Sequence, residues 1–135
     1  MIIKNIKILG LATLLLLGSF RADAQKKKEP VNRILFVFDA SGSMAYRWQS
    51  GSKIKIAKDL LSNMVDSLKY IKNLEIGLRV YGHRSSHLLE DCDDTNLEMN
   101  FLKAHDAADI IKKKLSQITS KGTSPIARSL EEGAK

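Results

Sequence analysis

Residues 33–43 read RILFVFDASGS, an apolar run that ends in an acid and continues into a loop of small hydroxyl residues. Residues 33–39 form a continuous apolar run that ends in an acid. The lack of alternation is typical of a strand buried on both faces, as in a parallel sheet. Three oxygen-bearing side chains leave the carboxyl end of that strand at alternate positions: Asp39, Ser41 and Ser43. In an open α/β sheet, ligands bind at this end of the strands. The stretch therefore predicts a parallel sheet with a polar site at the end of its first strand.

A helix and a second strand follow at the spacing of a βαβ unit. Residues 53–70 carry apolar side chains at helical spacing, and Ser52 before them is a candidate N-cap. Residues 75–81 (EIGLRVY) predict a second strand. Two strands joined through a helix pair in parallel, with a right-handed crossover.

The rest of the chain continues this alternation. We expect a polar loop over residues 82–96, a short edge strand over 97–101 and an amphipathic helix over 105–118. A turn over residues 121–124 precedes a third helix over 125–135, with Pro125 at its first position. The predicted fold class is α/β: a Rossmann-like, doubly wound, mostly parallel sheet flanked by helices.

The composition excludes several classes of protein. The chain has 135 residues, 44% of them hydrophobic and 27% charged, which argues against disorder. Its single cysteine excludes a self-contained disulfide scaffold or a cysteine-based zinc site. Aromatic residues make up 6%, too few for a platform that stacks on single-stranded nucleic acid.

The first 24 residues have the pattern of a secretory signal peptide. Two lysines precede an apolar stretch, residues 8–20, and residues 22–24 (ADA) form an A-x-A cleavage signal before Gln25. A membrane-spanning helix needs about 20 apolar residues, more than this stretch offers. We therefore predict cleavage, no stable membrane span in the mature chain, and a secreted, periplasmic or cell-surface location.

Basic residues gather in two runs. Residues 25–32 form a basic linker that contains the first run, Lys26–Lys28, and the second run, Lys112–Lys114, lies on the polar face of a predicted helix. Loss of the signal peptide lowers the formal charge from +7 to +5. Both runs are interpreted as solvated surface, and no nucleic-acid partner is expected.

The spacing of oxygen atoms in the D-x-S-x-S stretch suits a metal ion. Carboxylate and hydroxyl oxygens are ligands for hard cations such as Mg²⁺, Mn²⁺ or Ca²⁺. Gly42 is expected to let the backbone turn so that both hydroxyls face one point. The alternative is a Ser/Gly loop in which Asp39 caps the next turn.

The chain resembles the von Willebrand factor A domain family. Residues 39–44 (DASGSM) match the family's D-x-S-G-S motif after its first strand, and residues 122–127 (GTSPIA) with Leu130 look like its G-x-T-P-I-A…L segment. Residues 82–84 (GHR) and 91–95 (DCDDT) resemble a secreted bacterial branch of the family. The order and position of the motifs make the resemblance specific.

In that family the motif is a metal-ion-dependent adhesion site. The resemblance implies that Ser41 and Ser43 bind the metal through their hydroxyls. Asp39 would act mostly through water and by accepting hydrogen bonds. The family's threonine falls on Ser124, with Thr123 as the alternative third hydroxyl.

One departure concerns the extent of the domain. The family's strand order is 3-2-1-4-5-6, and another metal-site aspartate follows its fourth strand, for which this sequence has no counterpart. We therefore expect residues 33–135 to be the N-terminal portion of such a domain. The first strand would then keep an unpaired apolar edge, and residues 25–135 alone are expected to aggregate.

Cys92 lies in an acidic loop. In an oxidising compartment we expect it to form a disulfide with a partner beyond Lys135, the alternative being a free thiol. A calcium site in the same loop is a further alternative, built from its acids: Glu90, Asp91, Asp93 and Asp94.

The resulting prediction is a divalent-cation-dependent protein-binding or adhesion module of a secreted bacterial protein, and not an enzyme. Its partner would be a protein that offers a carboxylate to the metal. One alternative is a hydrolase using Ser41 or Ser43 with His83, although the G-x-S-x-G pattern of α/β hydrolases is missing. The other is a scaffold whose metal site is inert.

Overall fold

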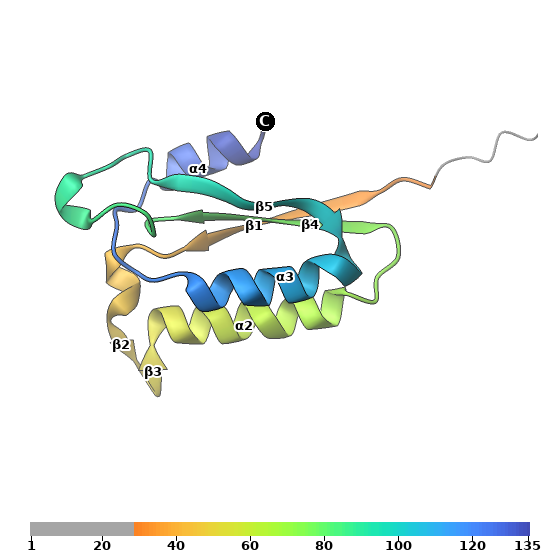
Figure 1. The fold of residues 1–135 in the computed structure, drawn as a ribbon, viewed down its shortest axis with the longest axis horizontal. Helices are drawn as coiled ribbons and strands as arrows, with labels where there is room; N and C mark the ends of the chain where they lie inside the picture. The colour runs from red at the N-terminus through yellow and green to blue at the C-terminus, as the bar shows by residue number, and fades with distance from the viewer. Residues whose placement is uncertain (1–28) are drawn as a thin grey trace, which may run out of the picture.

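The computed structural model describes residues 29–135, so the predicted signal peptide and the start of the linker lie outside the described residues. Strands and helices are interspersed along the chain (Figure 1). Their bounds are β1 Asn32–Asp39, η1 Gly42–Ala45, β2 Arg47–Trp48, β3 Gly51–Ser52, α2 Lys53–Leu68, β4 Leu74–Tyr81, η2 His87–Leu89, β5 Thr95–Lys103, α3 Ala104–Gln117 and α4 Ile126–Gly133. None of the helices within residues 29–135 has the length and apolar character needed to cross a membrane.

Three strands form one mixed sheet in the order β1-β4-β5. β1 and β4 pair in parallel from Asn32↔Leu74 to Asp39↔Tyr81, as expected for two strands joined through α2. β5 pairs antiparallel with the other edge of β4. The α/β class is thus confirmed, with one parallel and one antiparallel strand pair in the described part of the chain.

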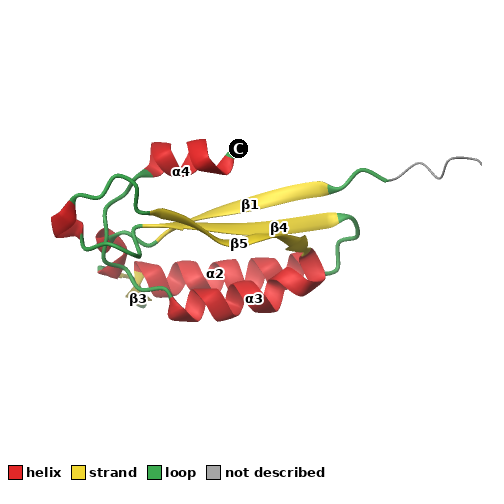
Figure 2. Cartoon of the chain, turned by 45° about the horizontal axis from the view of Figure 1, so that its top comes forward, coloured by secondary structure: helices red, strands yellow, loops and turns green. Residues whose placement is uncertain are grey.

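The helices form a layer on each face of the sheet. α2 and α3 lie side by side on one face, and α4 lies on the other (Figure 2). Alternate residues of β4 (Ile76, Leu78 and Val80) are fully buried in one apolar cluster with Val65 of α2 and Ile111 of α3. Their spacing of two follows from the pleat of a strand, and it places the main core between the sheet and the helix pair.

Gly77 of β4 faces the side of the sheet on which α4 lies. A Cβ atom there would stand 3.0 Å from Leu35 Cδ1 and 3.3 Å from Phe101 Cε1. The missing side chain therefore lets apolar groups of β1 and β5 close over the central strand.

The structure corrects several expected boundaries. β5 spans nine residues, Thr95–Lys103, instead of the five expected at 97–101, because ladder hydrogen bonds join backbone groups whether or not the side chains are polar. The loop after β1 holds η1 and the β2–β3 hairpin. Ser52 occupies the N-cap of α2 without a side-chain capping bond, and Pro125 is the N-cap of α4 instead of its first residue.

β1 lies at the edge of the sheet as far as residues 29–135 are concerned. It pairs with β4 on one side only, and of its eight residues only Phe38 is buried. An unpaired strand edge with apolar side chains is a template for pairing with another chain. This agrees with the expectation of an unpaired apolar edge.

Candidate functional site

The three oxygen-bearing residues of the motif meet at the carboxyl end of β1. Asp39 is the last residue of the strand, and its Oδ1 accepts a 2.8 Å hydrogen bond from the Ser41 backbone N–H. The Oγ atoms of Ser41 and Ser43 lie 3.2 Å apart. Ser41 is 2% exposed, so its hydroxyl is held in place by the surrounding chain. The carboxylate thus orients the loop, and the two hydroxyls converge.

The turn that aligns the hydroxyls does not depend on glycine at position 42. The short helix η1 begins at Gly42, and the Met44 N–H donates to the Ser41 carbonyl at 3.0 Å. A Cβ atom on Gly42 would have its nearest neighbour at 3.6 Å, an ordinary contact. Among the glycines of residues 29–135 only Gly82 has a left-handed φ, of 71°. The expectation that Gly42 supplies special backbone freedom is therefore wrong.

Gly82 and Gly122 bring two distant loops against the motif. Gly122 forms an isolated parallel bridge with Ser41, and its carbonyl accepts from the Gly42 N–H at 2.8 Å. The Gly122 N–H donates to the Gly82 carbonyl at 2.8 Å. A Cβ on Gly82 would lie 2.5 Å from the Thr123 carbonyl oxygen and 2.6 Å from Ser41 Cα. Only glycine permits this approach.

The loop around Gly122 carries the two candidates for a third hydroxyl ligand. Thr123 Oγ1 donates to the Asp91 carbonyl at 2.5 Å, so this hydroxyl is already used. Ser124 is exposed, and its hydroxyl makes no hydrogen bond within residues 29–135. The structure brings Ser124 to the same end of the sheet as Ser41 without a direct bond between them. Of the two candidates, Thr123 and Ser124, only Ser124 has a hydroxyl that remains available.

Asp94 organises the loop that follows β4, a role missed at the sequence level. Its carboxylate is 1% exposed and accepts the Arg84 N–H at 3.1 and 3.2 Å and the Ser85 N–H at 2.9 Å. Its carbonyl accepts from the Gly82 N–H at 2.9 Å. The available signal was an acid thirteen residues after Tyr81, the last residue of β4, but the neighbouring acids Asp91 and Asp93 concealed it.

The other acids of this loop face separate partners. The pKa of Asp91 is lowered by hydrogen bonds from the Ser85 hydroxyl, 2.7 Å away, and the Asp93 N–H. Asp93 pairs with Arg128 at 2.9 Å, and Cys92 is exposed, with no disulfide among the described residues. Within residues 29–135 no three His, Cys, Asp or Glu side chains come together as a metal-binding group. The calcium alternative thus stays a prediction, without a ready-made ligand group among the described residues.

His83 lies in a different hydrogen-bond network from the two serines. Its Nε2 is 3.0 Å from Glu98 Oε1 on β5, and Lys114 of α3 donates to Glu98 Oε2 at 3.2 Å. Asn96 also donates to Glu98, at 2.6 Å. Within residues 29–135 no hydrogen bond joins His83 to Ser41 or to the other serine of the motif. The structure thus does not bring the residues of the hydrolase alternative into a catalytic dyad.

Tyr81 is a second residue that sequence reasoning did not select. It is the register partner of Asp39 at the end of β4 and is 7% exposed. Burial, together with the neighbouring carboxylate of Asp39, raises the pKa of Tyr81 to about 12. The phenol therefore stays protonated at neutral pH, next to the first acid of the motif.

Glu98 makes the stability of this network depend on pH. Burial favours its neutral form, but hydrogen bonds from Asn96, His83 and Lys114 outweigh burial, and the pKa of Glu98 is lowered. A lowered pKa stabilises the folded state above the ordinary glutamate value, and this stabilisation is lost as the pH falls through the lowered value. In urea unfolding, Glu98→Gln should reduce the loss of stability between pH 6 and pH 3. An unchanged loss would contradict this, and Glu131→Gln is the surface control.

Comparisons with solved structures show the fold of the chain but not the sequence family to which it belongs. No protein-family model matches the chain, and no curated protein sequence matches it. The PilB minor pilin from Streptococcus sanguinis is similar over 78% of the chain, with a TM-score of 0.61 and 18% identity. BatB from Bacteroides thetaiotaomicron matches over 76% with a TM-score of 0.54 and 20% identity. An aerotolerance-related membrane protein from Bacteroides fragilis matches over 76%, with a TM-score of 0.56 and 21% identity.

This chain corresponds to only a part of each of these proteins. It spans 26% of the pilin, 44% of BatB and 45% of the aerotolerance-related protein. At such identities the comparisons establish a shared fold for the described residues.

Proposed function

We propose that the chain is a von Willebrand A-like module that binds a divalent cation at the end of β1 and a partner protein through that cation. The observation that carries the proposal is the convergence of Ser41 and Ser43, with Oγ atoms 3.2 Å apart beside the carboxylate of Asp39. The module would be part of a secreted or surface protein. It needs no chemical turnover.

The donor set fits magnesium. Mg²⁺ binds oxygens at 2.0–2.1 Å in an octahedron, so two neighbouring ligand oxygens stand about 2.9 Å apart. The separation of the two serine hydroxyls is close to that value. Ser41, Ser43 and Ser124 would hold the ion, and Asp39 would orient bound water. Mn²⁺ or Ca²⁺ would use the same hard oxygen donors.

Neutral ligands make such a site suited to recognition. Hydroxyl groups leave much of the charge of a divalent cation uncompensated. The bound ion would supply a coordination position that attracts a carboxylate oxygen of the partner. In this chain the convergence of β1, Gly82 and Gly122 holds the hydroxyls in place before the ion binds.

The comparisons support a location outside the cytoplasm. One protein with this fold is described as a minor pilin and another as a membrane protein. The predicted signal peptide of this chain is consistent with a module that works at or beyond the cell surface.

Mg²⁺ should stabilise the full-length protein against heat. A ligand present at 100 times its dissociation constant adds about 2.7 kcal/mol if it binds only the folded state. For a domain of this size the melting temperature should rise on the order of 10 °C. Ser41→Ala combined with Ser43→Ala should abolish the rise, as measured by differential scanning calorimetry with and without Mg²⁺.

Two variants serve as controls for the calorimetry. Ser116→Ala removes an exposed serine hydroxyl on α3 and should keep the full Mg²⁺ effect. His83→Ala should keep it as well, although its stability without metal will be lower. A Mg²⁺ effect of equal size in the double serine variant would disprove the proposed site.

A further inference from the structure

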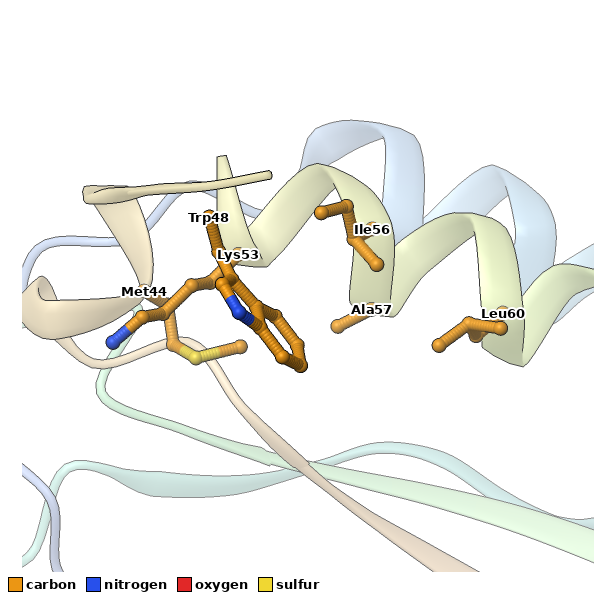
Figure 3. A pocket seen from close by; sticks show the side chains of 6 residues that line it. All are labelled: Met44, Trp48, Lys53, Ile56, Ala57 and Leu60. Atoms are coloured by element: carbon orange, nitrogen blue, oxygen red, sulfur yellow. The ribbon is translucent and has the colours of Figure 1, made fainter. Parts of the chain in front are cut away.

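An open apolar groove lies between the β2–β3 hairpin and α2. Its volume is about 540 Å³, and Figure 3 shows the side chains on its walls. The hairpin side contributes Trp48, which is 56% exposed, beside Met44. The helix side contributes Leu60, which is 62% exposed, with Ala57 and Ile56. Large apolar groups on the hairpin and on the helix thus face solvent.

The groove is continuous with the candidate metal site through η1. Ser43 and Met44 are consecutive residues of this helix, so one faces the converging hydroxyls while the next lines the groove. Consecutive Cα atoms are about 3.8 Å apart. When a partner protein binds at the two serines, a neighbouring side chain of that partner can therefore reach the groove.

The rim of the groove is positively charged. Lys53 lines it and makes no ion pair within residues 29–135. Lys55 is the next cation along α2, and it is neutralised by Asp59 at 2.8 Å. The surroundings of the apolar walls thus carry uncompensated positive charge, which is complementary to acidic groups.

We infer that this groove is the docking surface for a protein segment that carries a bulky apolar side chain next to an acidic residue. The inference rests on the proposed function and names the chemistry of its partner. The apolar side chain packs between Trp48 and Leu60, and the acid faces Lys53 and the candidate metal site. Exposed tryptophan is among the residue types that dominate binding energy at interfaces.

A random dodecapeptide library displayed on phage is the probe. Selection on the full chain in Mg²⁺ should enrich sequences with Asp or Glu within three residues of Trp, Phe or Leu. Enrichment without this pairing, or no enrichment, would overturn the inference. The best peptide is then synthesised together with a variant in which its acid is replaced by the amide.

Trp48 reports on the groove directly, since it is the only tryptophan of the chain. Binding of the peptide should shift its fluorescence to shorter wavelength as the indole leaves water. Leu60→Ser should weaken binding at least about tenfold, since truncating a central anchor has effects of this order. Leu88→Ser, at a position 80% exposed on η2, should change binding less than about twofold. Equal binding to Leu60→Ser would overturn the inference.

The metal and the groove are tested separately. Leu60→Ser should keep the Mg²⁺-dependent rise in melting temperature, so that loss of peptide binding reports on the groove alone. Absence of that rise in the unmodified chain would instead refute the proposed metal site. Sedimentation tests whether a second copy of the chain fills the groove instead. A dimer that Leu60→Ser converts to monomer would show this and would overturn the inference.

Discussion

Gly82→Ala should destabilise the protein by about 2–5 kcal/mol, because two costs add at one position. The residue has a φ of 71°, where a side chain strains the backbone. Its Cβ would also lie 2.5 Å from the Thr123 carbonyl oxygen and 2.7 Å from the Ser41 N. Both of these atoms belong to the backbone, so the clash is relieved only if the loops separate. Urea unfolding at pH 7 measures the change, and Mg²⁺-dependent stabilisation should be lost with it.

Gly42→Ala is the matched control within the motif. A Cβ there meets nothing closer than 3.6 Å, and φ is not left-handed. Its effect should stay below about 1 kcal/mol, the propensity difference between glycine and alanine. If both substitutions cost the same, the close packing of Gly82 against Ser41 is not what holds the site together.

Asp94→Ala should cost a similar amount, about 2–5 kcal/mol, by removing the buried carboxylate that accepts from two backbone N–H groups. A hydrogen bond to a charged group contributes about 1.5–3 kcal/mol, and the bonds from the Arg84 and Ser85 N–H groups would both be lost. The loop next to Gly122 would then open. Hydrogen exchange at the Gly122 N–H, which donates to the Gly82 carbonyl, should accelerate in parallel with the loss in urea stability.

Asp93→Ala separates this effect from the loss of a negative charge. Asp93 is 77% exposed and pairs with Arg128 at the surface, where an ion pair contributes about 0–1 kcal/mol. Its removal should leave exchange at Gly122 unchanged. Equal acceleration in both variants would show that the buried carboxylate has no special role in joining the two loops.

Strands and helices with continuous patterns could be predicted closely. β1 begins one residue before the expected start, β4 begins at Leu74 instead of residue 75, and α2 ends two residues early. Their apolar spacing is decided by local geometry, so the sequence contains the information. β5 was underestimated because its ends are polar, and its length depends on the partner strand β4.

The site could be predicted in part. The alternation of Asp39, Ser41 and Ser43 at a strand end indicated converging oxygens, and the structure places the two hydroxyls 3.2 Å apart. Tyr81 was missed, since only the parallel register of β1 and β4 places it opposite Asp39. The choice between Thr123 and Ser124 also needed the structure, because the Thr123 hydroxyl donates a hydrogen bond to the carbonyl of Asp91, 32 residues earlier.

The sequence by itself determined the order of the main strands and helices, the parallel pairing of β1 with β4 and the polar loop that follows β1, since each of these follows from local apolar and polar patterns. Only the tertiary structure decided which glycine is indispensable. Gly42 lies in the motif and has space around it, whereas Gly82 lies outside the motif and has none. The difference arises from backbone of distant segments, at Ser41 and Thr123, which meets at Gly82 only in the folded chain.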